Sequence, residues 1–304
     1  MKKAQQDIQI INLSKRLTLS QELDEQPELI QDLIIIFSLV GVRCFDLSPK
    51  KEIVEAANIA IKEAQSLSKT LGLEFVEPIL NVSVGRINPF LGDYLLTEKT
   101  KSLDTFDLDL LETQLISLSQ LGVKTFELHS SSIEEDLLEE IWRLLTRLVK
   151  DNYLLLNVNR NFLSNSQMVN LIKKLFYITP EKKMILVLDG ATSNYLGHNY
   201  SDTIQTLATT DIAIKDLKIR ERRVFKKLPI FICGDINRKT IALAKICSID
   251  YQGISFGDHG SNNFYLPVLN KLSKSIESKL DRHKTISRCI DMGRELYNQY
   301  NYTF

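Results

Sequence analysis

Eight short apolar runs, each closed by a polar residue or glycine and followed by a helix-like segment, recur along the 304-residue chain. The runs end at Ser14, Asp46, Ser83, His129, Asn159, Asp189, Asp235 and Gly257. Parallel strands joined by helical crossovers produce this alternation. The sequence therefore predicts an α/β fold, a (β/α)8 TIM-type barrel in one domain over residues 1–304. A flavodoxin-like sheet is the alternative, although it would need fewer units.

The predicted strands and helices follow from the same alternation. The strands are expected at residues 8–13, 42–47, 79–84, 124–129, 153–159, 184–189, 229–235 and 253–257. Ser48 is expected to cap the helix that begins at Pro49, and Gly72 to end it. A capping box is expected at residues 131–134. The segments 201–227 and 262–300 read as helical, and the connection 85–105 is unusually long.

Composition restricts the possible partners and the compartment. The formal net charge is zero, and hydrophobic residues make up 44% of the chain. A neutral chain gives no sign of a nucleic-acid or anionic-membrane partner. No apolar stretch approaches the roughly 20 residues of a membrane span, and the first residues do not resemble a signal peptide. We therefore expect a cytoplasmic protein that binds a small molecule or a regulatory protein.

The four cysteines are expected to be structural. They are Cys44, Cys233, Cys247 and Cys289, and none forms a C-x2-C pair. Cys44 and Cys233 lie in apolar strand-like runs, where cysteine usually acts as a small buried hydrophobic residue. No cofactor is predicted, no metal site is assigned, and an iron–sulfur cluster is not expected.

Polar residues at the strand ends form the candidate site, because in a barrel these ends converge on one pocket. The ring comprises Asn12, Asp46, Asn81, Glu127, His129, Asn157, Asn159, Asp189, Asp235, Asp258 and His259. Side chains alternate along a strand, so about half of them can point into the barrel mouth. The candidate ligand-binding positions are five members of this ring and two glycines next to it: Asp46, Asn81, Asn157, Gly234, Asp235, Gly257 and Asp258.

The carboxylates suggest acid–base chemistry. Glu127, His129 and Asp189 are the candidate catalytic residues, with a carboxylate as general base and the histidine as acid. A cluster with Asp46 could also hold a divalent cation. Alternatively, each carboxylate caps a helix or pairs with a neighbouring cation. No lysine ends a strand, which argues against a Schiff-base aldolase.

The last two strand–helix loops are where barrels often hold phosphate. Gly234, Gly257 and Gly260 would let backbone amides approach an anion. Asp235 and Asp258 place negative charge in the same loops, and the glycines could instead only permit tight turns. Nucleotide-binding fingerprints and common hydrolase motifs are absent from the sequence.

Three stretches resemble the cyanobacterial light-dependent period protein family, iron–sulfur proteins of circadian input. The stretches are residues 32–57, with VGVRCFDL at 40–47; residues 123–143, with FELH at 126–129; and residues 186–257, with ICGDIN at 232–237 and GISFG at 253–257. The positions that match are Asp46, Glu127, His129, Asp189 and Gly234. The family's cysteine-rich segment is replaced here by residues 86–104, which contain no cysteine, so cluster binding does not carry over.

Two functions remain open at this point. The resemblance implies a non-catalytic or degenerate barrel that acts as a regulatory module and binds a small ligand or a protein. The glycines near the last two strands favour instead a phosphate-binding barrel enzyme, an isomerase, lyase or synthase that acts on a phosphorylated metabolite.

Overall fold

The computed structural model describes most of the chain. The described residues are 10–19, 23–85, 107–130, 133–149, 152–159, 163–179, 183–190, 203–217, 225, 228–234, 236–256, 264–277 and 281–298.

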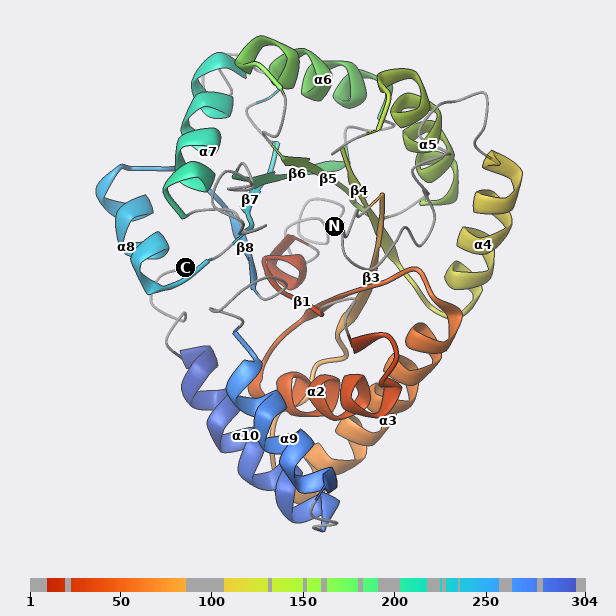
Figure 1. Ribbon diagram of the computed structural model, residues 1–304, viewed down its shortest axis with the longest axis vertical. Coiled ribbons are helices and arrows are strands. Elements are labelled where there is room, and N and C mark those ends of the chain that lie inside the picture. The colour runs from red at the N-terminus through yellow and green to blue at the C-terminus, as the bar shows by residue number, and fades with distance from the viewer. Residues whose placement is uncertain are drawn as a thin grey trace.

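Eight parallel strands close into a barrel in sequence order, with β1 paired to β8, so the predicted (β/α)8 barrel is confirmed (Figure 1). The strands are β1 (Lys15–Thr18), β2 (Cys44–Leu47), β3 (Ile79–Val84), β4 (Thr125–His129), β5 (Leu154–Asn159), β6 (Met184–Asp189), β7 (Ile230–Ile232) and β8 (Gly253–Phe256). From β2 onward, each observed strand lies within its predicted range.

Helices surround the barrel and alternate with the strands (Figure 1). They are α2 (Pro27–Val40), α3 (Lys51–Leu71), α4 (Leu108–Gln120), α5 (Glu135–Leu148), α6 (Asn165–Ile178), α7 (Thr203–Leu217), α8 (Arg238–Ile246), α9 (Leu266–Glu277) and α10 (Arg282–Asn298). Two helices, α9 and α10, follow β8 and pack beside α2. No helix in these described ranges is long and apolar enough to cross a membrane.

The helix ends agree with the sequence in part. Gly72 ends α3 in the left-handed conformation, with φ of 64°, as predicted. Ser48 does not cap α3: the N-cap is Lys50, and the Ser48 hydroxyl donates to Asp24 Oδ1 instead, at 2.8 Å. The predicted capping box before α5 is also wrong, because the N-cap is Glu134 and its side chain makes no capping bond.

The first predicted strand is wrong. Residues 10–13 are helical, and the strand that pairs with β2 and β8 begins only at Lys15. Ile10 and Leu13 are three residues apart, so one helical turn buries both against the apolar cluster inside the barrel. The true strand, KRLT, begins with two cations, so its sequence does not read as an apolar run.

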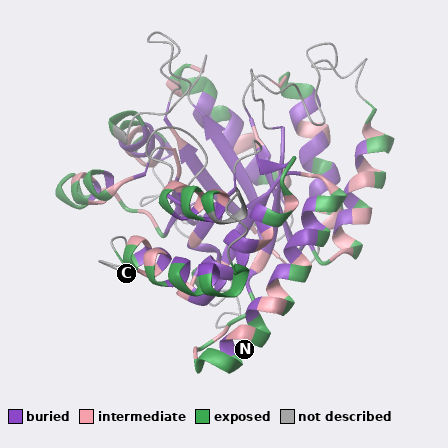
Figure 2. Ribbon diagram, turned by 60° about the horizontal axis from the view of Figure 1, so that its bottom comes forward, coloured by how far each residue is buried: buried purple, intermediate pink, exposed green. Residues whose placement is uncertain are grey.

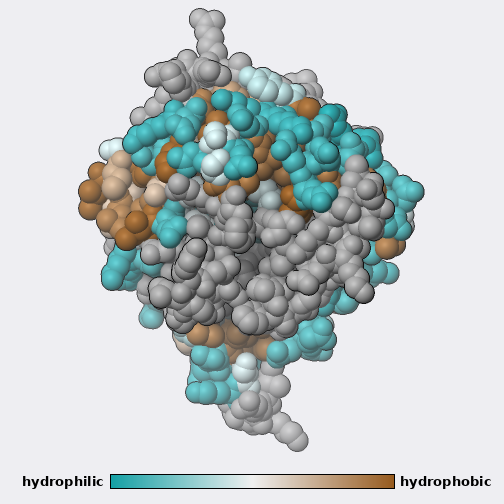
Figure 3. All heavy atoms as spheres, turned by 45° about the horizontal axis from the view of Figure 1, so that its top comes forward, coloured by the Kyte–Doolittle hydropathy of each residue, from teal (hydrophilic) through white to brown (hydrophobic). Residues whose placement is uncertain are grey.

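Two hydrophobic clusters hold the barrel together. The larger lies between the strands and the helices, and the smaller lies inside the barrel. In Figure 2 the strands are almost entirely buried, whereas the helices expose their outer faces. Hydrophilic residues cover much of the described surface in Figure 3. Lys215 on α7 pairs with Asp211 at 2.5 Å, which is typical of a solvated outer helix face.

Candidate functional site

Polar side chains from six strands form one hydrogen-bonded network inside the barrel. The alternation of each strand places these residues on the inner face. The members are Arg16 and Thr18 of β1, Asp46 of β2, Asn81 and Ser83 of β3, Glu127 and His129 of β4, Asn157 of β5 and Ser255 of β8. The network has two centres, each a carboxylate.

Glu127 is the first centre and is fully buried. Its Oε2 forms an ion pair with Arg16 Nη1. Its Oε1 accepts a hydrogen bond from Asn157 Nδ2 at 2.9 Å and lies 3.2 Å from His129 Nε2. Three neighbouring groups therefore hold this carboxylate in place. This geometry suits a residue that orients His129 better than one that removes a proton from a substrate.

Asp46 is the second centre, and it is also fully buried. Its Oδ1 accepts from Asn81 Nδ2 at 2.6 Å and from the Ser83 hydroxyl at 2.7 Å. Its Oδ2 accepts from the Thr18 hydroxyl at 3.2 Å. Buried carboxylates need such donors, because desolvation of the charge is costly. These three hydrogen bonds give the Asp46 side chain a structural role in the barrel interior.

The two centres are joined through β1 and β8. Arg16 Nε donates to the Ser255 hydroxyl at 3.1 Å, and that hydroxyl lies 2.9 Å from the Thr18 hydroxyl. Arg16 therefore reaches both the Glu127 centre and, through two hydroxyls, the Asp46 centre. A change at either carboxylate is expected to be felt at the other, because bonds in such a network support each other.

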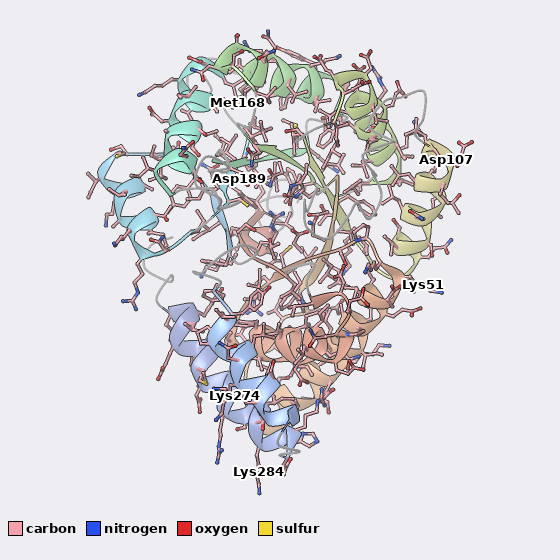
Figure 4. The ribbon with its side chains drawn as sticks, viewed as in Figure 1. Lys51, Asp107, Met168, Asp189, Lys274 and Lys284 are labelled. Carbon is pink, nitrogen blue, oxygen red and sulfur yellow. The ribbon has the colours of Figure 1, made fainter. Side chains whose placement is uncertain are left out.

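Polar side chains of the candidate site come near the surface at the ends of β4, β5 and β6. The His129 side chain is 15% exposed. Next to β5, Asp189 ends β6, and its Oδ2 accepts from Asn159 Nδ2 at 3.4 Å. Figure 4 shows Asp189 within the ring of helices, whereas the labelled Lys51, Asp107 and Lys274 lie on the outer elements.

Two buried amide oxygens in this network have no hydrogen-bond partner in the part of the chain that the structure describes. They are Asn81 Oδ1 and Asn157 Oδ1, and both residues are at most 1% exposed. In each case the Nδ2 group donates to a carboxylate, which fixes the orientation of the amide. An unpaired buried acceptor costs about 1–3 kcal/mol. Such atoms are therefore the places where a bound molecule would gain most.

The structure brings together five of the ring residues chosen from the sequence. Asp46, Asn81, Glu127, His129 and Asn157 share one network. Gly234 follows β7 with φ of 82°, a conformation that favours glycine. Three predicted ligand-binding positions, Asp235, Gly257 and Asp258, lie outside the described residues, as does His259.

One predicted ring member is wrong, and four participants were missed. Asn12 lies in the helical turn before β1 and not at the carboxyl end of a strand. The ring omitted Arg16, Thr18, Ser83 and Ser255. Ser83 lies two residues after Asn81, and Ser255 lies two residues before Gly257. Side chains two residues apart in a strand share a face, so alternation could have identified both serines. Arg16 required the correct first strand.

The cysteines lie in contrasting environments. Cys44 is completely buried inside the barrel, as predicted, and burial raises the pKa of its thiol to about 12. Cys233 is partly buried beyond β7, with its sulfur 4.0 Å from Asn157 Nδ2. Cys247 is exposed. Within the described part of the chain, no three His, Cys, Asp or Glu side chains are grouped as metal ligands.

The barrel shares its fold with solved structures, but its sequence matches no family model. No family model matches the chain, and no curated protein is similar to it in sequence. The YdjI aldolase from Escherichia coli K12 superposes with a TM-score of 0.53 at 7% identity, covering 99% of this chain and 96% of that one.

A structure described as a fructose-1,6-biphosphate aldolase from Coccidioides immitis has a TM-score of 0.51 at 10% identity, covering 98% and 96%. At these identities both likenesses establish the fold alone.

Proposed function

We propose that this protein is a barrel enzyme of the isomerase, lyase or synthase type, in which His129 exchanges a proton with a small metabolite. The observation that carries the proposal is the pair formed by His129 and Glu127. The histidine is partly exposed at a strand end, and its Nε2 lies 3.2 Å from a fully buried carboxylate. A histidine oriented by a carboxylate is a recurrent acid–base device.

The neighbouring residues have distinct roles in this proposal. Arg16 and Asn157 hold Glu127, and Glu127 in turn sets the orientation of the His129 ring. Asp189, on β6, is the candidate for the second acid–base group. Glu127 is thus assigned as a positioning residue, in place of the general base expected from the sequence. Two of the structural neighbours are aldolases, which is in keeping with a lyase.

The phosphate of a phosphorylated substrate would bind at the loops after β7 and β8. Gly234, at the start of the first loop, has the positive φ that allows its backbone to approach an anion. The other predicted phosphate positions lie outside the described residues, so the phosphorylated substrate stays a prediction.

A second candidate is a regulatory barrel that binds a small ligand or a protein without turnover, as the resemblance to the light-dependent period family implies. One observation favours it. Asp46 accepts three side-chain hydrogen bonds and Glu127 is held by three neighbours. A network of this kind can shape a binding site without reacting.

Incorporation of deuterium from the solvent into candidate substrates distinguishes the two functions. We would incubate the protein in deuterated water with triose, pentose and hexose phosphates and measure deuterium incorporation by mass spectrometry. Isomerases and lyases of this type labilise a carbon-bound hydrogen. The expected result is incorporation into one compound, reduced by about 10²–10⁴-fold in His129→Gln.

The matched control is His283→Gln, since His283 is exposed on α10 and distant in the chain from the strand ends. This variant should exchange at the wild-type rate. Exchange that persists in His129→Gln would refute the assigned role. A panel in which no compound exchanges would favour the binding protein.

A further inference from the structure

We propose that the molecule bound inside the barrel carries a protonated amine or amidine at its inner end. The inference rests on the site of the proposed function, but it does not require turnover. It starts from the two buried amide oxygens without a partner, Asn81 Oδ1 and Asn157 Oδ1. Both are acceptors, so the group that satisfies them must be a hydrogen-bond donor.

The orientation of each amide is determined by its neighbours. Asn81 Nδ2 donates to Asp46 Oδ1 at 2.6 Å, and Asn157 Nδ2 donates to Glu127 Oε1 at 2.9 Å. Turning either amide over would place its oxygen against a carboxylate oxygen, which is repulsive. The amide oxygens therefore have to face away from the carboxylates, and they remain acceptors.

The same arrangement recurs around the barrel. A carboxylate on one strand pairs with an asparagine on the neighbouring strand at Asp46 and Asn81, at Glu127 and Asn157, and at Asp189 and Asn159. The inner face of β2 to β6 is consequently rich in oxygen acceptors. A phosphate or carboxylate group presents only acceptors, so it would meet repulsion there.

Charge favours a cation over a neutral donor. Each of the two amides is bonded to a carboxylate, Asn81 to Asp46 and Asn157 to Glu127, so a carboxylate lies beside each of the two amide oxygens. An ammonium or amidinium group supplies N–H donors to the amide oxygens and positive charge to the surrounding carboxylates. Hydrogen bonds that involve a charged group are stronger than neutral ones.

Asn157 is the acceptor nearer to the exposed part of the site. It is the register partner of His129 across β4 and β5, and His129 is partly exposed. Asn81 pairs with Thr125, at the beginning of β4, so it lies deeper relative to that strand. A ligand that enters past His129 would reach Asn157 first.

Alkylation of Cys233 provides a direct test in the wild-type protein. Its sulfur lies 4.0 Å from Asn157 Nδ2, so a molecule bound at Asn157 should shield it. We would measure the rate of iodoacetamide labelling at constant ionic strength while adding 1,3-diaminopropane, its neutral isostere 1,3-propanediol, or tetramethylammonium, a cation without N–H groups. The expected result is saturable protection of Cys233 by the diamine alone.

Two controls are internal to the chain. Labelling of the exposed Cys247 should be unaffected by all three compounds. The diamine should bind about 10–100-fold more weakly to Asn157→Leu. It should bind unchanged to Asn58→Ala, which removes an amide that bonds Leu121 O in the helical layer.

The result that would overturn the proposal is also clear. Equal protection by the diol or by tetramethylammonium, or no saturable protection by the diamine, would show that the acceptors do not select a charged donor. Unchanged diamine binding in Asn157→Leu would show the same. Protection by the diamine, together with a panel in which no compound shows His129-dependent deuterium exchange, would favour the binding protein and leave this inference standing.

Discussion

The two halves of the barrel interior differ in chemistry although the same strands build both. Near the amino ends of the strands the interior is apolar, formed by Leu13, Cys44, Tyr153, Leu155, Ile185, Val187 and Phe231. Toward the carboxyl ends it is the polar network. Along each strand the inward-facing side chain changes from apolar to polar within two residues. This change occurs from Cys44 to Asp46 on β2, from Leu155 to Asn157 on β5, and from Val187 to Asp189 on β6.

This difference separates stability from function along each strand. The apolar half gains free energy from burial without any demand on hydrogen bonding. Buried donors and acceptors in the polar half need hydrogen-bond partners, and two amide oxygens find none among the described residues. Natural proteins concentrate such local costs at functional sites. The polar half is therefore where selection for a ligand would leave its mark.

The largest effect is expected from breaking the buried ion pair in the polar half. Arg16→Met leaves Glu127 buried without its cation, so the free energy of unfolding should fall by about 3–5 kcal/mol in urea titration. The double variant Arg16→Met/Glu127→Leu should recover part of the loss, because it removes the buried charge but leaves Asn157 Nδ2 without its acceptor. A single-variant loss below about 1 kcal/mol would mean that the pair behaves like an exposed one.

A smaller effect is expected from overfilling the apolar half. A Cβ atom at Gly253 would lie 2.5 Å from two ring carbons of Phe231, which is completely buried. Gly253→Ala should therefore reduce the free energy of unfolding by about 1–3 kcal/mol, measured in the same way. Adding Phe231→Leu should relieve the clash. If Phe231→Leu instead lowers the free energy of unfolding further, then the Phe231 ring was able to move away from the new methyl group and there was no clash to relieve.

The smallest effect is expected at Cys44, which should not react in the native protein. Burial raises its pKa from 9.0 to about 12, so at pH 9 about one thiol in a thousand is ionised. Peptide mapping after iodoacetamide treatment should show Cys247 labelled and Cys44 labelled only in urea. Native labelling of Cys44 at a rate comparable to Cys247 would show that water reaches the apolar half.

The same pKa shift has a consequence for stability. The unfolded thiol ionises near pH 9.0 and the folded one near 12. Above pH 9 the unfolded state therefore releases a proton that the native state retains, and the native state loses stability as the pH rises between those values.

The sequence predicts the barrel well because its apolar runs are buried on both sides. Strand β6 is hydrophobic except for Asp189 at its end, and β5 is hydrophobic except for Asn157 and Asn159 in its last three residues. The prediction from sequence fails at β1, because two cationic residues begin that strand. Arg16 is tolerated inside the barrel because Glu127, which is 111 residues away in the chain, neutralises it. No local pattern reports such a partner.

The sequence predicted which residues form the site better than it predicted what each residue does there. Strand-end position identified Asp46, Glu127 and His129, because parallel strands place their ends together. The role of Glu127 depends on which atoms surround it, and three neighbours from β1, β4 and β5 decide that. The amide oxygens of Asn81 and Asn157 became informative only through their orientation, which sequence does not contain.

The helical turn at residues 10–13 has a consequence for kinetics. Ile10 and Leu13 fill the amino end of the barrel, and this turn lies at the centre of the ring in Figure 1. The amino end of the barrel is thus closed, so a molecule that binds at the polar network would enter and leave at the carboxyl ends of the strands. In the proposed enzyme, substrate and product would share this one route, so departure of the product would have to precede entry of the next substrate.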